Sequence, residues 1–146
     1  MRFKEFYLEL SVLFNYFQSF SLLFARLILA YGFYEPALTK WTNFETTTEW
    51  FGSLGIPFSP FMTLLSASFE LMGIFLLVLG LFTRLITLPL IAIMVVAFFT
   101  VHLPNGFSVA NNGFEIPLYY SLFLLFLLSH GAGRFSLDAL IFGKER

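Results

Sequence analysis

Four long apolar stretches constrain the fold of this 146-residue chain more than any other feature. Each is roughly 17–23 residues long, the length that an α-helix needs to cross the ~30 Å hydrocarbon core of a bilayer. They cover about residues 19–38, 60–82, 85–101 and 114–129. With 58% hydrophobic and only 12% charged residues, a water-soluble domain could not cover its apolar surface. The sequence predicts an all-α membrane protein, a four-helix transmembrane bundle forming one domain over residues 1–146.

Charge and cysteine content exclude several classes of function. Eight Lys and Arg against nine Asp and Glu give a net charge of −1 without a basic run, so nucleic acid is not an expected partner. The absence of Cys excludes thiolate metal ligands and thiol–disulfide chemistry within the chain. No His-x-x-His or Glu-x-x-His spacing is present, and we expect no metal site. No flavin, haem or iron–sulfur motif is evident, so electrons for a redox reaction would come from a partner or a directly bound reductant.

The basic residues predict how the chain is oriented in the membrane. With four spans, the N-terminus, the turn at Thr83 and the C-terminus lie on one side. Lys40 alone falls on the other side, whereas six basic residues fall on the first: Arg2, Lys4, Arg84, Arg134, Lys144 and Arg146. The positive-inside rule therefore predicts cytoplasmic termini.

We expect residues 1–18 to form an amphipathic helix at the interface. A cleaved signal peptide is the alternative, against which Arg26 and the preceding acidic residues argue.

Turn and cap residues set the expected limits of the helices. Pro36 is expected to kink or end the first span. Residues 40–57 are expected to form a wet loop, with two tryptophans at the membrane boundary. Gly131-Ala-Gly133 is expected to end the fourth span. Ser136 is expected to be the N-cap of a short amphipathic helix.

Two ionisable residues lie at membrane depth and are candidates for function. Arg26 lies roughly 10 Å from the cytoplasmic edge, and Glu70 lies roughly 15 Å from the other edge at 1.5 Å per residue. Adjacent antiparallel helices could therefore bring them together as a buried polar pair. Both residues lie on helical stripes, Glu70 with Ser66, Gly73, Leu77 and Gly80, and Arg26 with Ala30, Phe33 and Ala37. The pair either locks two helices together or forms a proton or ligand site.

A second polar cluster is expected on the outer side of the membrane. Glu35 ends the first span, His102 ends the third, and Glu115 begins the fourth, with Asn105 and Asn112 in the loop between the last two. Imidazole and carboxylate groups together can transfer protons or hydrogen-bond a quinone carbonyl. Interfacial side chains that merely cap helix ends are an equal alternative.

Several motifs in order resemble the DoxX family. They are ELMGIFLLVLGLFTR at 70–84, VHLPNGF at 101–107, NGFEIP at 112–117, GAGRFSLD at 131–138, and RLILA at 26–30 with the following 32–40 segment. The resemblance implies a small four-helix protein of the bacterial inner membrane. Some relatives, the DoxD-like branch, act as membrane subunits of a thiosulfate:quinone oxidoreductase, and others are linked to redox-stress complexes. It also marks Arg26, Glu70, His102 and Glu115 as motif positions without assigning a catalytic residue.

The expected function is therefore that of a membrane subunit in a quinone-linked redox system, with quinone as substrate and a redox partner protein. The mechanism would be hydrogen bonding and proton transfer at the quinone headgroup. One alternative is a non-catalytic membrane anchor or assembly factor for a partner protein. Another is a small-molecule or proton carrier that uses Glu70, for which four spans would suffice in a homo-oligomer.

Overall fold

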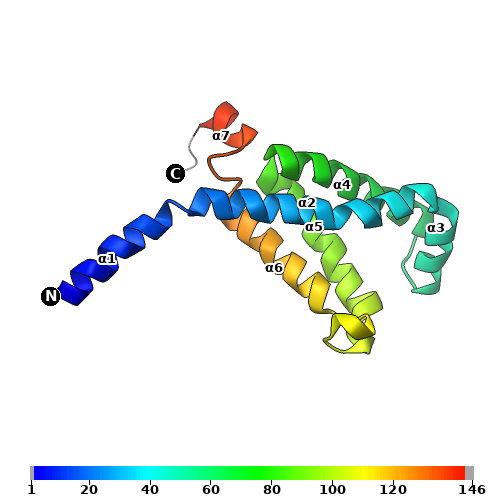
Figure 1. Ribbon diagram of the computed structural model, residues 1–146. Coiled ribbons are helices and arrows are strands. Elements are labelled where there is room, and N and C mark those ends of the chain that lie inside the picture. The colour runs from blue at the N-terminus through cyan, green and yellow to red at the C-terminus, as the bar shows by residue number, and fades with distance from the viewer. Residues whose placement is uncertain (1, 144–146) are drawn as a thin grey trace.

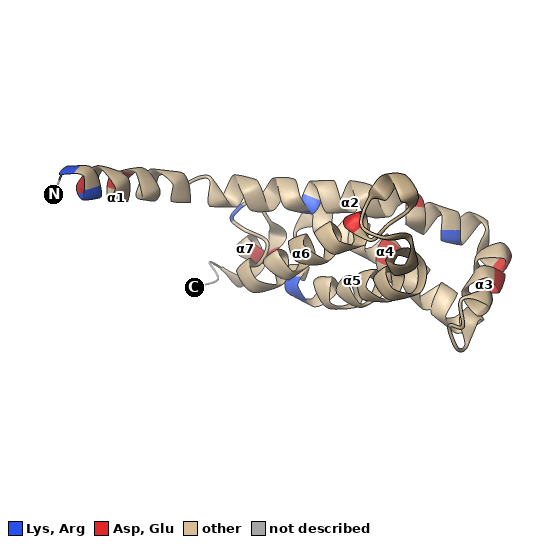
Figure 2. Ribbon diagram, turned by 90° about the horizontal axis from the view of Figure 1, so that it is seen from below, with Lys and Arg blue, Asp and Glu red and all other residues tan. Residues whose placement is uncertain are grey.

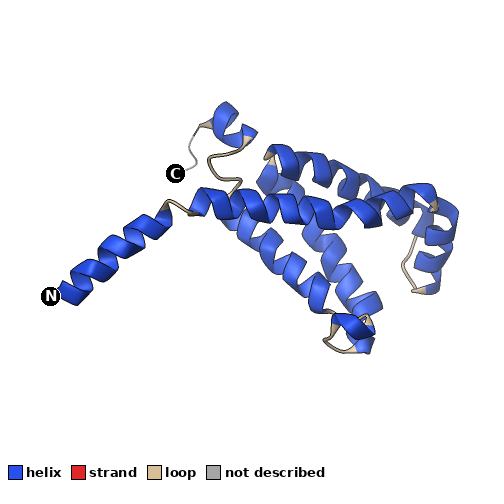
Figure 3. Ribbon diagram, viewed as in Figure 1, coloured by secondary structure: helices blue, strands red, loops and turns tan. Residues whose placement is uncertain are grey.

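The computed structural model describes residues 2–143, and within that range it contains helices and loops without a strand (Figure 3). The longer helices are α1 (Arg2–Asn15), α2 (Gln18–Thr42), α3 (Phe44–Ser53), α4 (Ser59–Leu79), α5 (Thr83–Ala97), α6 (Glu115–His130) and α7 (Leu137–Phe142). Between α5 and α6 lie a π-helical turn, η1 (Phe98–His102), and two 3₁₀ turns, η2 (Leu103–Asn105) and η3 (Val109–Asn111). The predicted all-α class is confirmed.

The body consists of two antiparallel helix pairs that cross each other (Figure 1). Helix α2 packs along α4, and α5 packs along α6. Helix α3 covers the first part of α4 at one end of the molecule, while α7 lies at the other end, near the start of α2 (Figure 1). Helix α1 projects away from the body, and none of its side chains is buried.

Two segments, Ser59–Leu79 and Thr83–Asn105, are long and apolar enough to cross a membrane. Helices α1 and α2 together qualify as a third span despite a 43° bend between them, and α6 is a shorter apolar helix. A multi-pass membrane protein is consistent with these helices. The four-span bundle and the cytoplasmic termini stay predictions, and two of the basic residues behind the orientation, Lys144 and Arg146, lie outside the described residues.

The predicted helix stripes form the centre of the body. Every member of the two stripes is buried: Arg26, Ala30, Phe33 and Ala37 on α2, and Ser66, Glu70, Gly73, Leu77 and Gly80 along α4 and its C-cap. Close packing explains the small residues, because a Cβ at Gly73 would lie only 2.9 Å from a Leu90 methyl on α5. Charged residues are sparse along the helix bodies (Figure 2), so the buried ones are exceptional.

The helix limits differ from the expected ones mainly around the first loop. Pro36 does not end the first span, and α2 continues through it to Thr42. The segment expected as a wet loop contains the ten-residue helix α3. The two caps are confirmed: Gly131 ends α6 at φ 76°, and the Ser136 hydroxyl accepts a hydrogen bond from the Ala139 N–H at 3.2 Å.

Candidate functional site

Glu70 forms a buried ion pair with Lys40 rather than with Arg26. The Lys40 Nζ lies 3.0 Å from Oε1 and 2.8 Å from Oε2 of Glu70, whose side chain is 1% exposed. In a helix, each Cβ tilts toward the N-terminus of its own helix. Because α2 and α4 are antiparallel, this tilt turns the two side chains toward each other. The ammonium therefore reaches the carboxylate from a position near the far end of α2.

Lys40 also lines a cavity of about 310 Å³ between α2 and α3, which we call the α2–α3 cavity. Its lining residues are Glu35, Pro36, Thr39, Lys40, Thr47 and Trp50. The neighbouring Trp41 donates a hydrogen bond from Nε1 to the Ala67 carbonyl at 3.2 Å, which fastens this part of α2 to α4. The cavity is thus lined by the exposed Glu35, by Trp50 and by Lys40, the residue whose ammonium forms the buried pair.

Arg26 is completely buried, and its hydrogen-bond partners lie away from Glu70. Its Nη1 donates to the carbonyls of Leu77 at 2.9 Å and Val78 at 3.3 Å, and its Nη2 donates to the Phe135 carbonyl. Leu77 lies seven residues beyond Glu70, about 10 Å along the axis of α4. The tilt that brings Lys40 toward Glu70 directs Arg26 toward the start of α2, away from Glu70. The expected Arg26–Glu70 pairing is therefore corrected.

Asp138 is a buried carboxylate that the sequence analysis missed. Its oxygens accept hydrogen bonds from the N–H groups of Phe82 at 2.7 Å and Thr83 at 3.0 Å, at the start of α5. Asp138 also contributes a favourable electrostatic interaction with Arg26. Gly80 lies between them at φ +64°, and a Cβ there would collide with the Arg26 guanidinium. No spacing in the sequence links Asp138 to α5, because the contact spans 55 residues.

The outer polar cluster is only partly assembled. His102 Nδ1 lies 2.9 Å from the Asn112 carbonyl oxygen, and Asn105 Nδ2 donates to the same oxygen at 3.1 Å. Glu115 accepts a hydrogen bond from the Val109 N–H at 3.0 Å. These contacts fold the loop on itself. Glu35 belongs instead to the α2–α3 cavity, which Figure 1 separates from that loop.

Lys40 and Trp50 are the other residues of the site that sequence reasoning did not select. Lys40 is the only basic residue assigned to the outer side, and this could have singled it out in the sequence. Within residues 2–143, no three His, Asp or Glu side chains gather in a way that could hold a metal ion.

The fold and the buried charges define a helical membrane protein in which Lys40 pairs with Glu70 across two helices and Arg26 donates to backbone carbonyls of α4 and of the segment before α7. The chain belongs to the DoxX family, whose family model matches residues 21–103. The matched segment contains both Arg26 and the Lys40–Glu70 pair. The family expected from the sequence is confirmed.

Three curated relatives cover most of the chain. Two Haemophilus influenzae proteins, each named "Uncharacterized protein", are 36% and 35% identical; the alignments cover 83% and 88% of this chain and 83% and 96% of theirs. A Bacillus subtilis protein named "Putative oxidoreductase CatD" is 32% identical over 84% of this chain and 89% of its own. No solved structure matches the chain.

Proposed function

We propose that the protein is a membrane subunit of a quinone-linked redox system and that the α2–α3 cavity receives the quinone headgroup. The observation that carries the proposal is the buried Glu70 carboxylate, whose partner Lys40 reaches from the pair to the cavity. The name of the Bacillus subtilis relative, an oxidoreductase, supports the same class of reaction.

The chemistry follows from the donors of Lys40. An ammonium has three N–H donors, and two of them are directed to the Glu70 oxygens. The third is available for a quinone carbonyl oxygen, which only accepts hydrogen bonds. Reduction of a quinone to a quinol takes up two electrons and two protons. Electrons come from a partner protein or a bound reductant. Lys40 donates a proton to the carbonyl oxygen, and exposed Glu35 relays protons from solvent back to Lys40.

The shape and lining of the cavity also suit a planar headgroup. Its volume of about 310 Å³ lies at the lower end of the range for small-molecule sites, roughly 300–1,000 Å³. The Trp50 indole and the Pro36 ring supply apolar surface on which a quinone ring can stack. The polar groups are few, and they fix the orientation of the headgroup.

Quenching of tryptophan fluorescence by a short-chain benzoquinone tests this proposal, because Trp50 lines the cavity. We expect saturable quenching in the purified protein. Thr39→Phe places a ring in the cavity and should weaken binding about ten-fold, equivalent to about 1.4 kcal/mol. Thr42→Phe, one turn away and outside the cavity lining, is the matched control. Linear quenching without saturation, or equal affinities for the two variants, would contradict the proposed headgroup site.

A membrane anchor for a partner protein is the second candidate function. Helix α1 favours it, because its aromatic side chains project from the body with none buried. Gentle purification from native membranes distinguishes the two candidates through the molecules that remain bound. A quinone supports the redox subunit, whereas a protein partner without a quinone supports the anchor.

A further inference from the structure

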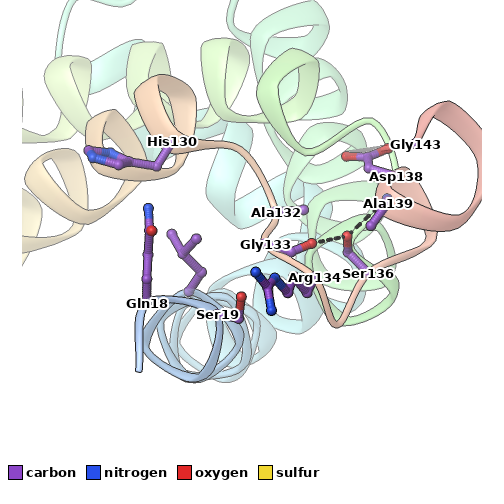
Figure 4. Close-up of a pocket in the computed structure, with 11 residues that line it drawn as sticks. Gln18, Ser19, His130, Ala132, Gly133, Arg134, Ser136, Asp138, Ala139 and Gly143 are labelled. Atoms are coloured by element: carbon purple, nitrogen blue, oxygen red, sulfur yellow. Dashed lines mark hydrogen bonds between the residues drawn. The ribbon is translucent and has the colours of Figure 1, made fainter. Parts of the chain in front are cut away.

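A second cavity lies at the end of the molecule where α2 begins and α6 ends (Figure 4). Its volume is about 240 Å³, and we call it the end cavity. It lies between the first turn of α2, the segment after α6, and α7. Its polar lining includes Gln18, Ser19, His130, Arg134, Ser136 and Asp138. At least 13 residues of α2 separate its lining from that of the α2–α3 cavity, about 20 Å along the helix.

The end cavity presents unused hydrogen-bond donors. Figure 4 shows Gln18 and Ser19 facing His130 and Arg134 across the opening. Within residues 2–143, the side chains of Gln18, Ser19 and Arg134 make no hydrogen bond or ion pair. His130 uses Nδ1 toward the Ser129 hydroxyl at 2.8 Å and the Phe126 carbonyl at 3.1 Å, which leaves Nε2 for a ligand.

The Asp138 carboxylate, which also lines the end cavity, does not cancel the positive charge of Arg134. Both oxygens of Asp138 accept hydrogen bonds from the start of α5, and the buried Arg26 charge balances it. Arg134 is exposed, with its planar guanidinium at the mouth of the cavity (Figure 4). Its five N–H donors have no partner among residues 2–143, and such a guanidinium suits a phosphate group better than a neutral ligand.

An apolar surface lies next to these donors. The rings of Phe20 and Phe135 contact each other at a centroid distance of 5.0 Å, and each side chain is 49% exposed. Phe20 follows Ser19 directly, and Phe135 follows Arg134 directly. Polar donors and exposed aromatic rings therefore adjoin at one end of a helical membrane protein. That arrangement matches an amphiphile with an anionic head and apolar chains.

We propose that the end cavity binds the phosphodiester headgroup of an anionic phospholipid. Arg134 binds the phosphate, Gln18 and Ser19 donate hydrogen bonds to it, and the acyl chains lie over Phe20 and Phe135. Free inorganic phosphate shares the charged chemistry but lacks the chains. The site is independent of the quinone proposal, because the two cavities share no lining residue.

Competition between lipids on the intact protein tests this site. The purified chain is exposed to an equimolar mixture of phosphatidylglycerol and phosphatidylcholine, and bound lipid is measured by native mass spectrometry. We expect phosphatidylglycerol to be retained preferentially. Arg134→Gln should lower that preference about ten-fold, because both lipids carry the phosphodiester but the Arg134 charge is repelled by the choline ammonium of phosphatidylcholine and not by the glycerol of phosphatidylglycerol. Gln18→Leu, which leaves the net charge unchanged, should lower retention of both lipids a few-fold, because its amide donates to the phosphate that both share.

Arg2→Gln on α1 is the matched control, because it removes the same charge far from the cavity. It should keep the wild-type preference. An equal fall in both Arg variants would indicate general charge attraction and overturn the site, as would an unchanged preference in Arg134→Gln. Excess inorganic phosphate should not displace the lipid, and displacement would assign the cavity to free phosphate instead.

Discussion

The opposite charges of Lys40 and Glu70 compensate each other's burial between two membrane helices. Glu70 is 1% exposed and Lys40 is 14% exposed, so both have given up most of their hydration. The attraction between them offsets that loss only while both are present. Replacing the pair by apolar side chains of similar size is often neutral, whereas removal of one partner leaves an uncompensated charge.

The stability of the Lys40–Glu70 pair can be measured by thermal unfolding in detergent. Lys40→Met should destabilise the protein by about 3–5 kcal/mol, because it leaves the Glu70 carboxylate buried without a partner. The double variant that also carries Glu70→Met should recover most of this loss. Lys4→Met on exposed α1 is the control and should have little effect. A single Lys40 variant as stable as wild type would contradict the pair.

The spacing of residues along the helices predicted which charged side chains are buried better than it predicted their interaction partners. The helical period correctly placed Arg26 and Glu70 on inward faces, because burial depends only on which side of one helix a residue occupies. Pairing also depends on the offset between two helices and on the tilt of each side chain. The depth of Arg26 in the membrane was estimated only to within a turn or so. That estimate could not tell whether its partner is Glu70 or the Leu77 carbonyl, two turns away.

At the scale of elements, the short helix α7 fixes the end of α4 and the start of α5 and lies close to a buried charge on α2. Asp138 on α7 accepts both hydrogen bonds from the first turn of α5 and stabilises the charge of Arg26 on α2. Its own N–H donates to the Gly80 carbonyl at the end of α4 at 2.9 Å. A carboxylate at a helix N-terminus is favoured by the free N–H groups and the helix dipole.

Loss of this cap should be visible at the start of α5. Asp138→Ala should cost about 1–2 kcal/mol through the lost cap. Asp138→Asn should cost less, since the amide oxygen still accepts one hydrogen bond. Hydrogen exchange should become faster at the Phe82 and Thr83 amides in the alanine variant. Glu49→Ala on exposed α3 serves as control. Unchanged exchange at both amides in the Asp138→Ala variant would refute the cap.

Local sequence patterns predicted that the elements are helices, but they did not predict where α2 ends or that α3 exists. The apolar stretches identified the bodies of α4, α5 and α6 because each is a continuous run. Pro36 was expected to interrupt α2, yet a proline within a membrane helix is tolerated when its neighbours compensate. The polar composition of α3 concealed it, since only Thr47 is buried there and no apolar periodicity results.

At the scale of the whole molecule, the lengths of the helices in the two crossed pairs affect how the chain fits the bilayer. Helix α6 has 16 residues, so it extends about 24 Å, less than the ~30 Å hydrocarbon core. A short span requires local thinning of the bilayer or contributions from flanking residues. Gly131 and the segment that returns to α7 lie at one end of α6, and the 3₁₀ turns lie at the other. The predicted four-span topology places these two ends on opposite sides of the membrane.

The absence of cysteine makes this topology directly testable, because a single introduced thiol is the only one in the chain. Ser53→Cys at the end of α3 and Ser108→Cys before η3 should react with a membrane-impermeant maleimide in intact cells. Ser11→Cys on α1 and Gly143→Cys after α7 should react only after permeabilisation. The unsubstituted chain should not react at all. If Ser53 and Ser108 label from opposite sides, α4 and α5 do not both cross the membrane; if Gly143 labels in intact cells, the predicted cytoplasmic C-terminus is wrong.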